Sequence, residues 1–237
     1  MSAFYLLLSR KEFKKRIKQL YEILEECELC PRKCRVNRLK NEKGFCRVGG
    51  KLVVSSYHSH FGEEFPLVGQ AGSGTIFFTF CNLACKYCQN YDISHLGLGR
   101  QISEPKLAKI MLHLQDSGCS NINLVSSTHQ VPFIVKAIFL AKSQGLRIPI
   151  VYNTNSYDSV RTLRLLKNII DIYLPDFKYS NDKIAEKFSL APKYFSIAKK
   201  AITEMFKQVG NLKIKNKVAY QGLLVRHLVL PNNLAGT

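Results

Sequence analysis

The spacing of apolar residues predicts one amphipathic helix near the start of the chain, followed by alternating strands and helices. Between Glu12 and Glu26, apolar residues recur at the three- and four-residue spacing of a helix face. Beyond this helix, short and nearly continuous apolar runs alternate with stretches that carry an apolar helical face. The predicted strands are Lys51–Tyr57, Thr75–Phe80, Asn121–Val125, Ile148–Tyr152, Ile169–Leu174 and Leu223–Leu230, and the predicted helices between them are Lys106–Gln115, Pro132–Ser143, Asp158–Lys167 and Pro192–Val209.

This alternation predicts an α/β fold built on a parallel sheet. Strands that are apolar throughout are buried on both faces, and parallel neighbours need right-handed helical crossovers. We therefore expect a partial (β/α)6-type TIM barrel of parallel strands, with its active site at the carboxyl ends of the strands. The glycine-rich stretch Gly69–Gly74 marks the expected boundary between an N-terminal helix with a Cys-rich module (residues 1–70) and the barrel (residues 71–237).

The charge of the chain and its short apolar runs bear on whether it binds nucleic acid or a membrane. The chain has 35 basic and 17 acidic residues, a net charge of +18. Such a balance can mark a nucleic-acid partner, but the lysines are scattered and no nucleic-acid-binding signature accompanies them, so we expect solvated helix faces instead. The apolar run Ala3–Leu8 is too short for a signal peptide or a membrane span. We expect a cytoplasmic protein without a membrane partner.

Three of the eight cysteines have the spacing C-x3-C-x2-C and directly follow the strand predicted at Thr75–Phe80. They are Cys81, Cys85 and Cys88. Three thiolates on one loop can hold three irons of a [4Fe-4S] cluster and leave the fourth iron without a protein ligand. The alternatives are a zinc site, which normally needs a fourth Cys or His nearby, and three unrelated buried cysteines. The spacing and the position at a strand end favour the cluster.

The cysteine loop resembles that of the radical S-adenosylmethionine (SAM) superfamily, in which an aromatic residue, here Tyr87, precedes the third cysteine. The resemblance implies that S-adenosyl-L-methionine chelates the open iron, that its reductive cleavage gives a 5′-deoxyadenosyl radical for hydrogen abstraction, and that Tyr87 lies against the adenine. Further segments make almost the whole chain similar to uncharacterised iron–sulfur proteins of the pyruvate formate-lyase activating enzyme-like branch. These segments are residues 27–34, 44–46, 60–64, 121–125, 171–179 and 225–231.

The resemblance to glycyl-radical activases also implies positions that bind the cosubstrate. Asn153 and Thr154 match part of their Asp-Thr-Asn element, and Asp176 and Lys178 match residues of their fourth strand. In those enzymes such groups hold a monovalent cation and the carboxylate of the cosubstrate, and Asn153 in place of Asp removes one charge from the cation site. Without the resemblance, Asp176 and Lys178 would equally be a salt-bridged strand end.

Two features depart from the superfamily pattern. The Gly-Gly-Glu element that often follows the second strand is absent, so the side chains of Ser126–His129, or backbone carbonyls, would have to bind the cosubstrate's amino group. Relatives also continue past a strand such as Leu223–Leu230 into a further helix and strand. We therefore expect either a barrel that lacks its last elements or a C-terminally truncated chain.

A second group of cysteines, called the front cysteines below, lies in the N-terminal quarter. Its members are Cys27, Cys30, Cys34 and Cys46. Four thiols close a coordination shell, and a structural zinc ion or a second iron–sulfur cluster would both use them. Four reduced cysteines without metal are the alternative, which the C-x2-C spacing and the neighbouring basic residues make less favoured.

The residues favour one function and leave two others open. The favoured one is a radical SAM oxidoreductase of the activase type, with a flavodoxin or ferredoxin as electron donor and a protein among the expected substrates. The second is an iron–sulfur or zinc-binding electron-transfer or scaffold protein without SAM cleavage. The third, a radical SAM enzyme acting on RNA, is motivated by the net charge alone.

Overall fold

Nine strands form one sheet within residues 3–236, the part of the chain described by this computed structural model: β1 (Leu52–His60), β2 (Ser73–Phe78), β3 (Arg100–Ile102), β4 (Ile122–Val125), β5 (Ile150–Thr154), β6 (Ile172–Phe177), β7 (Lys213–Lys215), β8 (Val218–Leu223) and β9 (Arg226–His227). The strand order is β3-β1-β2-β4-β5-β6-β8-β7, and β9 also pairs with β6. From β2 to β8 the neighbours are parallel, whereas β1, β3 and β7 pair antiparallel.

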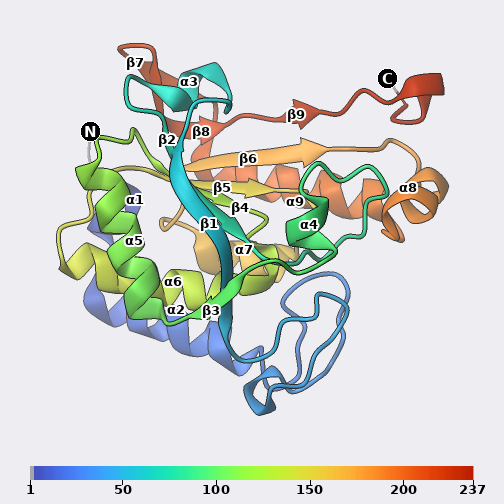
Figure 1. The fold of residues 1–237 in the computed structure, drawn as a ribbon, viewed down its shortest axis with the longest axis horizontal. Helices are drawn as coiled ribbons and strands as arrows, with labels where there is room; N and C mark the ends of the chain where they lie inside the picture. The colour runs from blue at the N-terminus through green and yellow to red at the C-terminus, as the bar shows by residue number, and fades with distance from the viewer. Residues whose placement is uncertain (1–2, 237) are drawn as a thin grey trace.

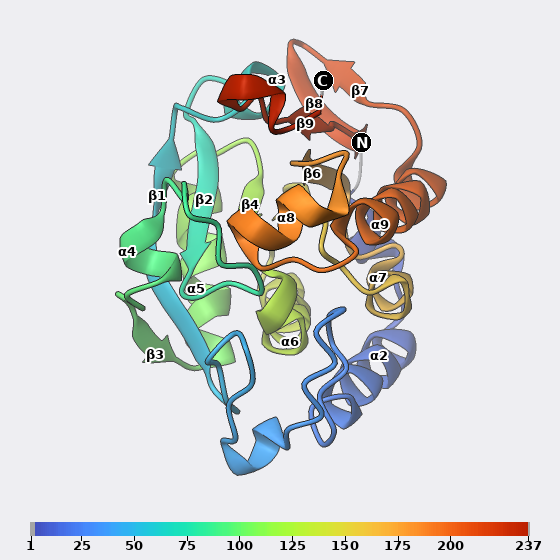
Figure 2. The same ribbon diagram turned by 90° about the vertical axis from the view of Figure 1, so that its right-hand side faces the viewer.

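The helices are α1 (Phe4–Leu7), α2 (Arg10–Glu22), α3 (Phe65–Val68), α4 (Tyr91–Ser94), α5 (Glu104–Asp116), α6 (Val131–Ser143), α7 (Val160–Leu166), α8 (Asp182–Ser189) and α9 (Tyr194–Val209). The longer ones, α2, α5, α6 and α9, cover one face of the curved sheet together with α7 (Figures 1 and 2). The amphipathic α2 begins after Ser9, whose hydroxyl accepts the Glu12 N–H as an N-cap, and it packs against α6 and α7. The predicted α/β fold with a mostly parallel central sheet is confirmed.

Residues on both sides of the expected boundary at residue 70 share one hydrophobic core. Phe13 and Leu20 of α2 are buried in the same cluster as Ile76 of β2 and Ile138 of α6. The strand β1 is itself paired with β2 in the central sheet. The division into two domains stays a prediction about the organisation of the sequence.

The predicted single strand Leu223–Leu230 is wrong in its extent. The chain pairs with β6 twice in the same register, first through Gly222 and Leu223 and again through Arg226 and His227. The gap between these two pairings lies opposite Pro175 of β6, which has no N–H to donate to the strand beside it. The sequence pattern also missed the short helix α8, although Asn181 caps it through its side-chain oxygen.

The parallel strands β5 and β6 point toward α4 and α8, so their carboxyl ends meet the segment that follows β2 (Figure 1). Three residues other than glycine adopt left-handed backbone conformations directly after strands at this edge: Phe80 (φ 68°), Ser126 (φ 57°) and Ser156 (φ 66°). Such conformations are costly and cluster at functional sites. No helix in residues 3–236 combines the length and the apolar character needed to cross a bilayer.

Candidate active site

The cysteine loop, residues 81–88, follows β2 and is held by the end of α8. The Ala84 N–H donates to the Ser189 carbonyl at 3.0 Å, and the Lys86 N–H donates to the Phe188 carbonyl at 2.8 Å. Arg32, from the front of the chain, donates from Nε to the Asn82 carbonyl at 2.9 Å. Hydrogen bonds from two distant segments to the backbone of the loop therefore fix a loop that has almost no regular structure of its own.

Each sulfur of the cysteine loop has a polar neighbour. Leu83 N–H and Asn155 Nδ2 lie 3.4 and 3.3 Å from Cys81 Sγ. The Ser189 hydroxyl lies 2.9 Å from Cys85 Sγ, and the Ser94 hydroxyl lies 3.1 Å from Cys88 Sγ. Donors of this kind stabilise metal-bound thiolates and tune the potential of iron–sulfur clusters.

The burial of the loop means that its thiolates need a positive centre. Burial raises the pKa of the Cys81 thiol to about 12, and it also raises the pKa of Cys85. A coordinated metal stabilises the deprotonated form directly. Among residues 3–236 no three His, Cys, Asp or Glu side chains converge closely enough to hold a single ion. Three thiols in the spacing C-x3-C-x2-C suit an iron–sulfur cluster with one open iron.

A group of four charged side chains lies at the carboxyl ends of the strands, beside the cysteine loop. Lys178 Nζ lies 2.7 Å from Asp176 Oδ2, and Arg226 Nε lies 2.7 Å from Asp176 Oδ1. Burial by itself would raise the pKa of Asp176, but the Lys178 and Arg226 cations outweigh it and hold the pKa below its usual value. Burial would lower the pKa of Lys178, but Asp176 and the nearby Cys85 raise it. Both groups are therefore charged at neutral pH.

Glu63 is the fourth charged member, and its carboxylate has three side-chain partners. Its Oε1 lies 3.1 Å from Arg226 Nη1, and its Oε2 accepts from Asn123 Nδ2 at 2.6 Å and from Asn153 Nδ2 at 3.1 Å. Arg226 Nη2 also donates to Asn153 Oδ1 at 2.8 Å. Glu63, Asn123, Asn153, Asp176, Lys178 and Arg226 are called the mouth network below.

The structure places the other two predicted cofactor-binding residues elsewhere. Thr154 follows Asn153 on β5 and so faces the opposite side of the sheet, where its hydroxyl donates to the buried Asp158 carboxylate. Burial raises the pKa of Asp158, although hydrogen bonds from Thr154 and two other hydroxyls oppose the shift. The Tyr87 hydroxyl donates to that of Tyr179, which in turn contacts the Ser189 hydroxyl. The structure thus brings Asn153, Asp176 and Lys178 together, but not Thr154.

The segment that replaces the Gly-Gly-Glu element also turns largely away from the mouth network. Thr128 donates to Asp158 at 2.9 Å, and the ring of His129 contacts the Thr79 carbonyl through Nε2 at 2.9 Å. Burial lowers the pKa of His129 to about 3, so this ring is neutral. The Ser127 hydroxyl is buried without a hydrogen-bond partner, which leaves it available to a ligand.

Comparison with known proteins agrees with this arrangement. The sequence pattern of the Radical SAM superfamily matches residues 75–219, from β2 to the start of β8. The chain belongs to this superfamily. An uncharacterized protein of Methanocaldococcus jannaschii is 36% identical over 223 residues, which are 90% of this chain and 59% of that protein. The chain therefore spans less than two thirds of this relative's length. The pyruvate formate-lyase-activating enzyme of Clostridium pasteurianum is 25% identical over 186 residues, 76% of this chain and 71% of that enzyme.

Membership of the radical SAM superfamily implies chemistry based on an iron–sulfur cluster and SAM. Cys81, Cys85 and Cys88 are the residues that would hold that cluster, and Lys178 of the mouth network interacts electrostatically with Cys81 and Cys85. Sequence reasoning missed Glu63, Asn123 and Arg226. The contact between Glu63 and Arg226 joins residues 163 positions apart, which no local spacing reveals. Both nevertheless lie in segments that carry the family resemblance, His60–Glu64 and Val225–Pro231.

Proposed function

We propose that the chain is a radical SAM enzyme that cleaves SAM reductively and uses the resulting radical to abstract a hydrogen atom. When bound at Cys81, Cys85 and Cys88, a [4Fe-4S] cluster with one open iron supplies the electron for this cleavage and the site at which SAM chelates. The observation that supports the proposal best is the position of three hydrogen-bonded thiols, one buried and two half-buried, at the carboxyl edge of a parallel sheet, next to a charged group.

The mouth network suits a zwitterionic cosubstrate. Its two carboxylates, Glu63 and Asp176, balance its two cations, Lys178 and Arg226. A ligand with both an ammonium and a carboxylate can exchange partners with these groups without leaving a buried charge unpaired. Lys178 is the best candidate for the ligand's carboxylate, because it interacts with both Asp176 and Cys85 and so lies nearest to the cluster. Asn153 and Asp176 would orient the ligand, and Tyr87 would lie against its adenine.

We further propose an activase-like role, in which the hydrogen atom comes from a protein substrate. The similarity to the pyruvate formate-lyase-activating enzyme of Clostridium pasteurianum supports this role. A low-potential carrier such as a flavodoxin or ferredoxin would supply the electron. The net charge of +18 suits an acidic carrier of this kind.

The segment after β4 favours a second candidate function, an iron–sulfur electron-transfer protein that does not cleave SAM. Thr128 and His129 are occupied by other contacts, so the amino group of SAM would find only the Ser127 hydroxyl or backbone carbonyls there. Under this second function the chain would hold a cluster and yield no 5′-deoxyadenosine.

One anaerobic assay separates the two functions. The protein is reconstituted with iron and sulfide, reduced with dithionite and given SAM, and 5′-deoxyadenosine is measured by chromatography. We expect the product from the native chain and from Cys119→Ala, which removes a buried thiol outside both cysteine groups. We expect none from Cys81→Ala, Cys85→Ala or Cys88→Ala. An intact cluster in the native chain without any 5′-deoxyadenosine would overturn the proposal in favour of the second function.

A further inference from the structure

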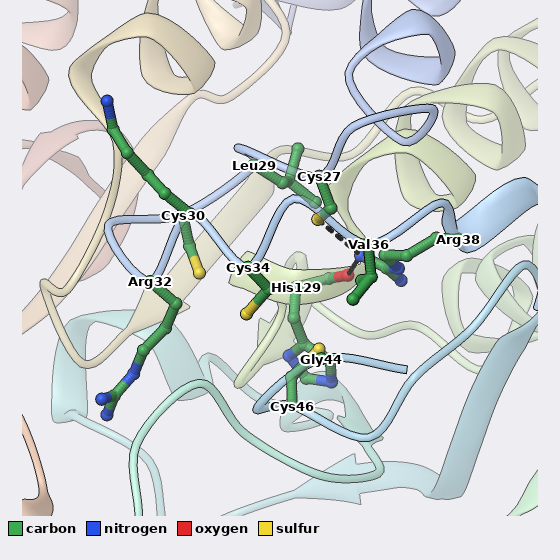
Figure 3. A pocket seen from close by; sticks show the side chains of 11 residues that line it. Cys27, Leu29, Cys30, Arg32, Cys34, Val36, Arg38, Gly44, Cys46 and His129 are labelled. Carbon is green, nitrogen blue, oxygen red and sulfur yellow. Dashed lines mark hydrogen bonds between the residues drawn. The ribbon is translucent and has the colours of Figure 1, made fainter. Parts of the chain in front are cut away.

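The four front cysteines line a single pocket, together with the neutral ring of His129. Cys27, Cys30 and Cys46 are buried and Cys34 is half-buried. Figure 3 shows their sulfur atoms arranged around a common space, and the described residues that line it include no carboxylate. The backbone brings them together, because the Cys27 N–H donates to the Val36 carbonyl and the Arg35 N–H donates to the Cys27 carbonyl. The loop therefore folds back on itself and turns its thiols toward one point of the interior.

A buried cation beside this pocket has no carboxylate partner. Arg38 is 1% exposed, and its guanidinium donates to the carbonyls of Gly49 and His129 and lies 4.0 Å from Cys27 Sγ. Within residues 3–236 it forms no ion pair with an acidic side chain. An unpaired buried charge is costly. Four thiolates around a metal centre carry the negative charge that would balance Arg38, whereas four neutral thiols do not.

A zinc ion and an iron–sulfur cluster would both take four thiolates. Arg32 and His129 link this pocket to the segment that carries the cysteine loop. This proximity favours the cluster, because an electron relay must lie close to its acceptor.

Cys34 has the surroundings of a cluster ligand. Its Sγ accepts the Phe45 N–H at 3.4 Å. Gly44 precedes this amide, and a Cβ at Gly44 would lie 2.6 Å from Cys34 Sγ, so only glycine allows the backbone to approach the sulfur. Backbone N–H groups directed at cysteine sulfurs are one of the factors that set iron–sulfur potentials.

Single side chains connect this pocket to the cysteine loop. Arg32 interacts electrostatically with Cys30, Cys34 and Cys81, and its Nε donates to the Asn82 carbonyl. Its Nη2 is buried without a hydrogen-bond partner. His129 lines the front pocket while its Nε2 contacts the carbonyl of Thr79, two residues before Cys81. The two cysteine groups are therefore neighbours, with one layer of side chains between them.

We propose that Cys27, Cys30, Cys34 and Cys46 ligate a second, polynuclear iron–sulfur cluster that relays electrons to the cluster of the cysteine loop. A reduced flavodoxin or ferredoxin gives one electron to the front cluster and is itself oxidised by one electron. The front cluster then passes that electron to the loop cluster and returns to its oxidised state. The binding of the front cluster is independent of the proposed function, whereas the relay rests on it.

The first test counts metals in a chain without the loop ligands. The triple variant Cys81→Ser/Cys85→Ser/Cys88→Ser is reconstituted anaerobically, and its iron, acid-labile sulfide and zinc are measured together with its EPR spectrum after reduction. We expect about two or about four irons per chain with equal sulfide, according to cluster type. Further substitution of Cys34, the most exposed front ligand, by Ser should alter or abolish this signal, whereas Cys119→Ala should leave it unchanged. One zinc per chain, or no metal, would overturn the second cluster.

The second test concerns the relay. 5′-Deoxyadenosine formation is measured with dithionite and with reduced flavodoxin, in the native chain and in Cys30→Ser/Cys34→Ser, whose loop cluster is quantified by its iron. We expect the ratio of the flavodoxin-driven rate to the dithionite-driven rate to fall about tenfold or more in the variant. An unchanged ratio would overturn the relay and leave the second cluster intact. If the native chain forms no 5′-deoxyadenosine with either reductant, the proposed function fails, while the metal counts still decide the front site.

Discussion

Arg226 donates from Nη2 to the side-chain oxygen of Asn153 at 2.8 Å. The same guanidinium contacts the carboxylates of Asp176 and Glu63, so one fixed cation joins the segment after β1 to β5 and to the end of β6. Resemblance to the activases implies a monovalent cation among such oxygens, with Asp where this chain has Asn153. Arg226 places a permanent positive charge among these oxygens, and we propose that it takes the place of such a cation.

The first prediction concerns the replacement of this cation. In Arg226→Ala, Asp176 and Glu63 lose a charged hydrogen-bond partner worth about 1.5–3 kcal/mol each, so we expect SAM to bind roughly 10- to 100-fold more weakly. Added K⁺, Na⁺ or guanidinium should restore part of the affinity, whereas the native chain should be indifferent to these ions at constant ionic strength. Equilibrium binding of SAM measures both effects. Arg164→Ala, which removes an exposed guanidinium, is the control. A loss of SAM affinity in Arg226→Ala that none of these cations restores would argue against this role.

The second prediction concerns Lys178. Lys178→Met keeps the length of the side chain and leaves Asp176 paired with Arg226. If Lys178 binds the carboxylate of SAM, the dissociation constant should rise about tenfold or more while iron content stays at the native level. Titration of the reconstituted protein with SAM, followed by EPR, gives the constant. An unchanged constant would mean that Lys178 serves only as a salt bridge at the strand end.

The third prediction concerns Ser189, whose hydroxyl donates to Cys85 Sγ at 2.9 Å. Hydrogen bonds to cluster sulfurs favour the reduced, more negative state. Ser189→Ala should therefore make the midpoint potential of the loop cluster more negative, which an anaerobic redox titration by EPR would detect. Ser117→Ala removes an exposed hydroxyl that donates to a helix carbonyl and should leave the potential unchanged. A potential equal to the native one in Ser189→Ala would show that this hydrogen bond does not reach a ligating sulfur.

The fourth prediction concerns stability and pH. Asp171 accepts N–H groups from Ile150 and Phe4, but burial dominates and raises its pKa to about 7. The unfolded value is about 3.9, so the folded state holds the proton more tightly. Its contribution to stability is complete below about pH 4 and is lost as pH rises toward 7. The urea midpoint should fall between pH 5 and pH 8 by more in the native chain than in Asp171→Asn. The exposed Asp116→Asn should behave like the native chain, and parallel curves for all three would contradict the assignment.

Local patterns in the sequence predicted much of the fold, because strand burial and helix periodicity depend on near neighbours. The parallel strands around Ile76, Leu124 and Tyr152 were predicted within a few residues of their observed limits. The double pairing of Gly222–His227 with β6 could not be read from apolar content, since Pro175 on a different strand interrupts it. Helix α8 was detectable from its cap at Asn181, but it has only eight residues and a strongly polar face.

In the candidate site, too, some residues could be predicted from the local sequence and others only from contacts between distant segments. Cys81, Cys85 and Cys88 follow from spacing within one loop, and Asp176 and Lys178 follow from the resemblance of their segment to the fourth strand of the activases. Glu63 and Arg226 acquire their roles only through tertiary contacts between segments far apart in the chain. Thr154 was predicted as a binding residue because it matches part of the Asp-Thr-Asn element of the activases, yet strand alternation turns its side chain to the other face of the sheet.

The most direct test of the central claim is electron–nuclear double resonance (ENDOR) on the reduced protein with SAM labelled by ¹⁵N at its amino group. Our account predicts a hyperfine coupling between that nitrogen and the loop cluster, which disappears in Cys85→Ala and persists in Cys119→Ala. A reduced loop cluster with full iron content and bound SAM, but without any such coupling, would contradict the claim that an open iron binds the cosubstrate.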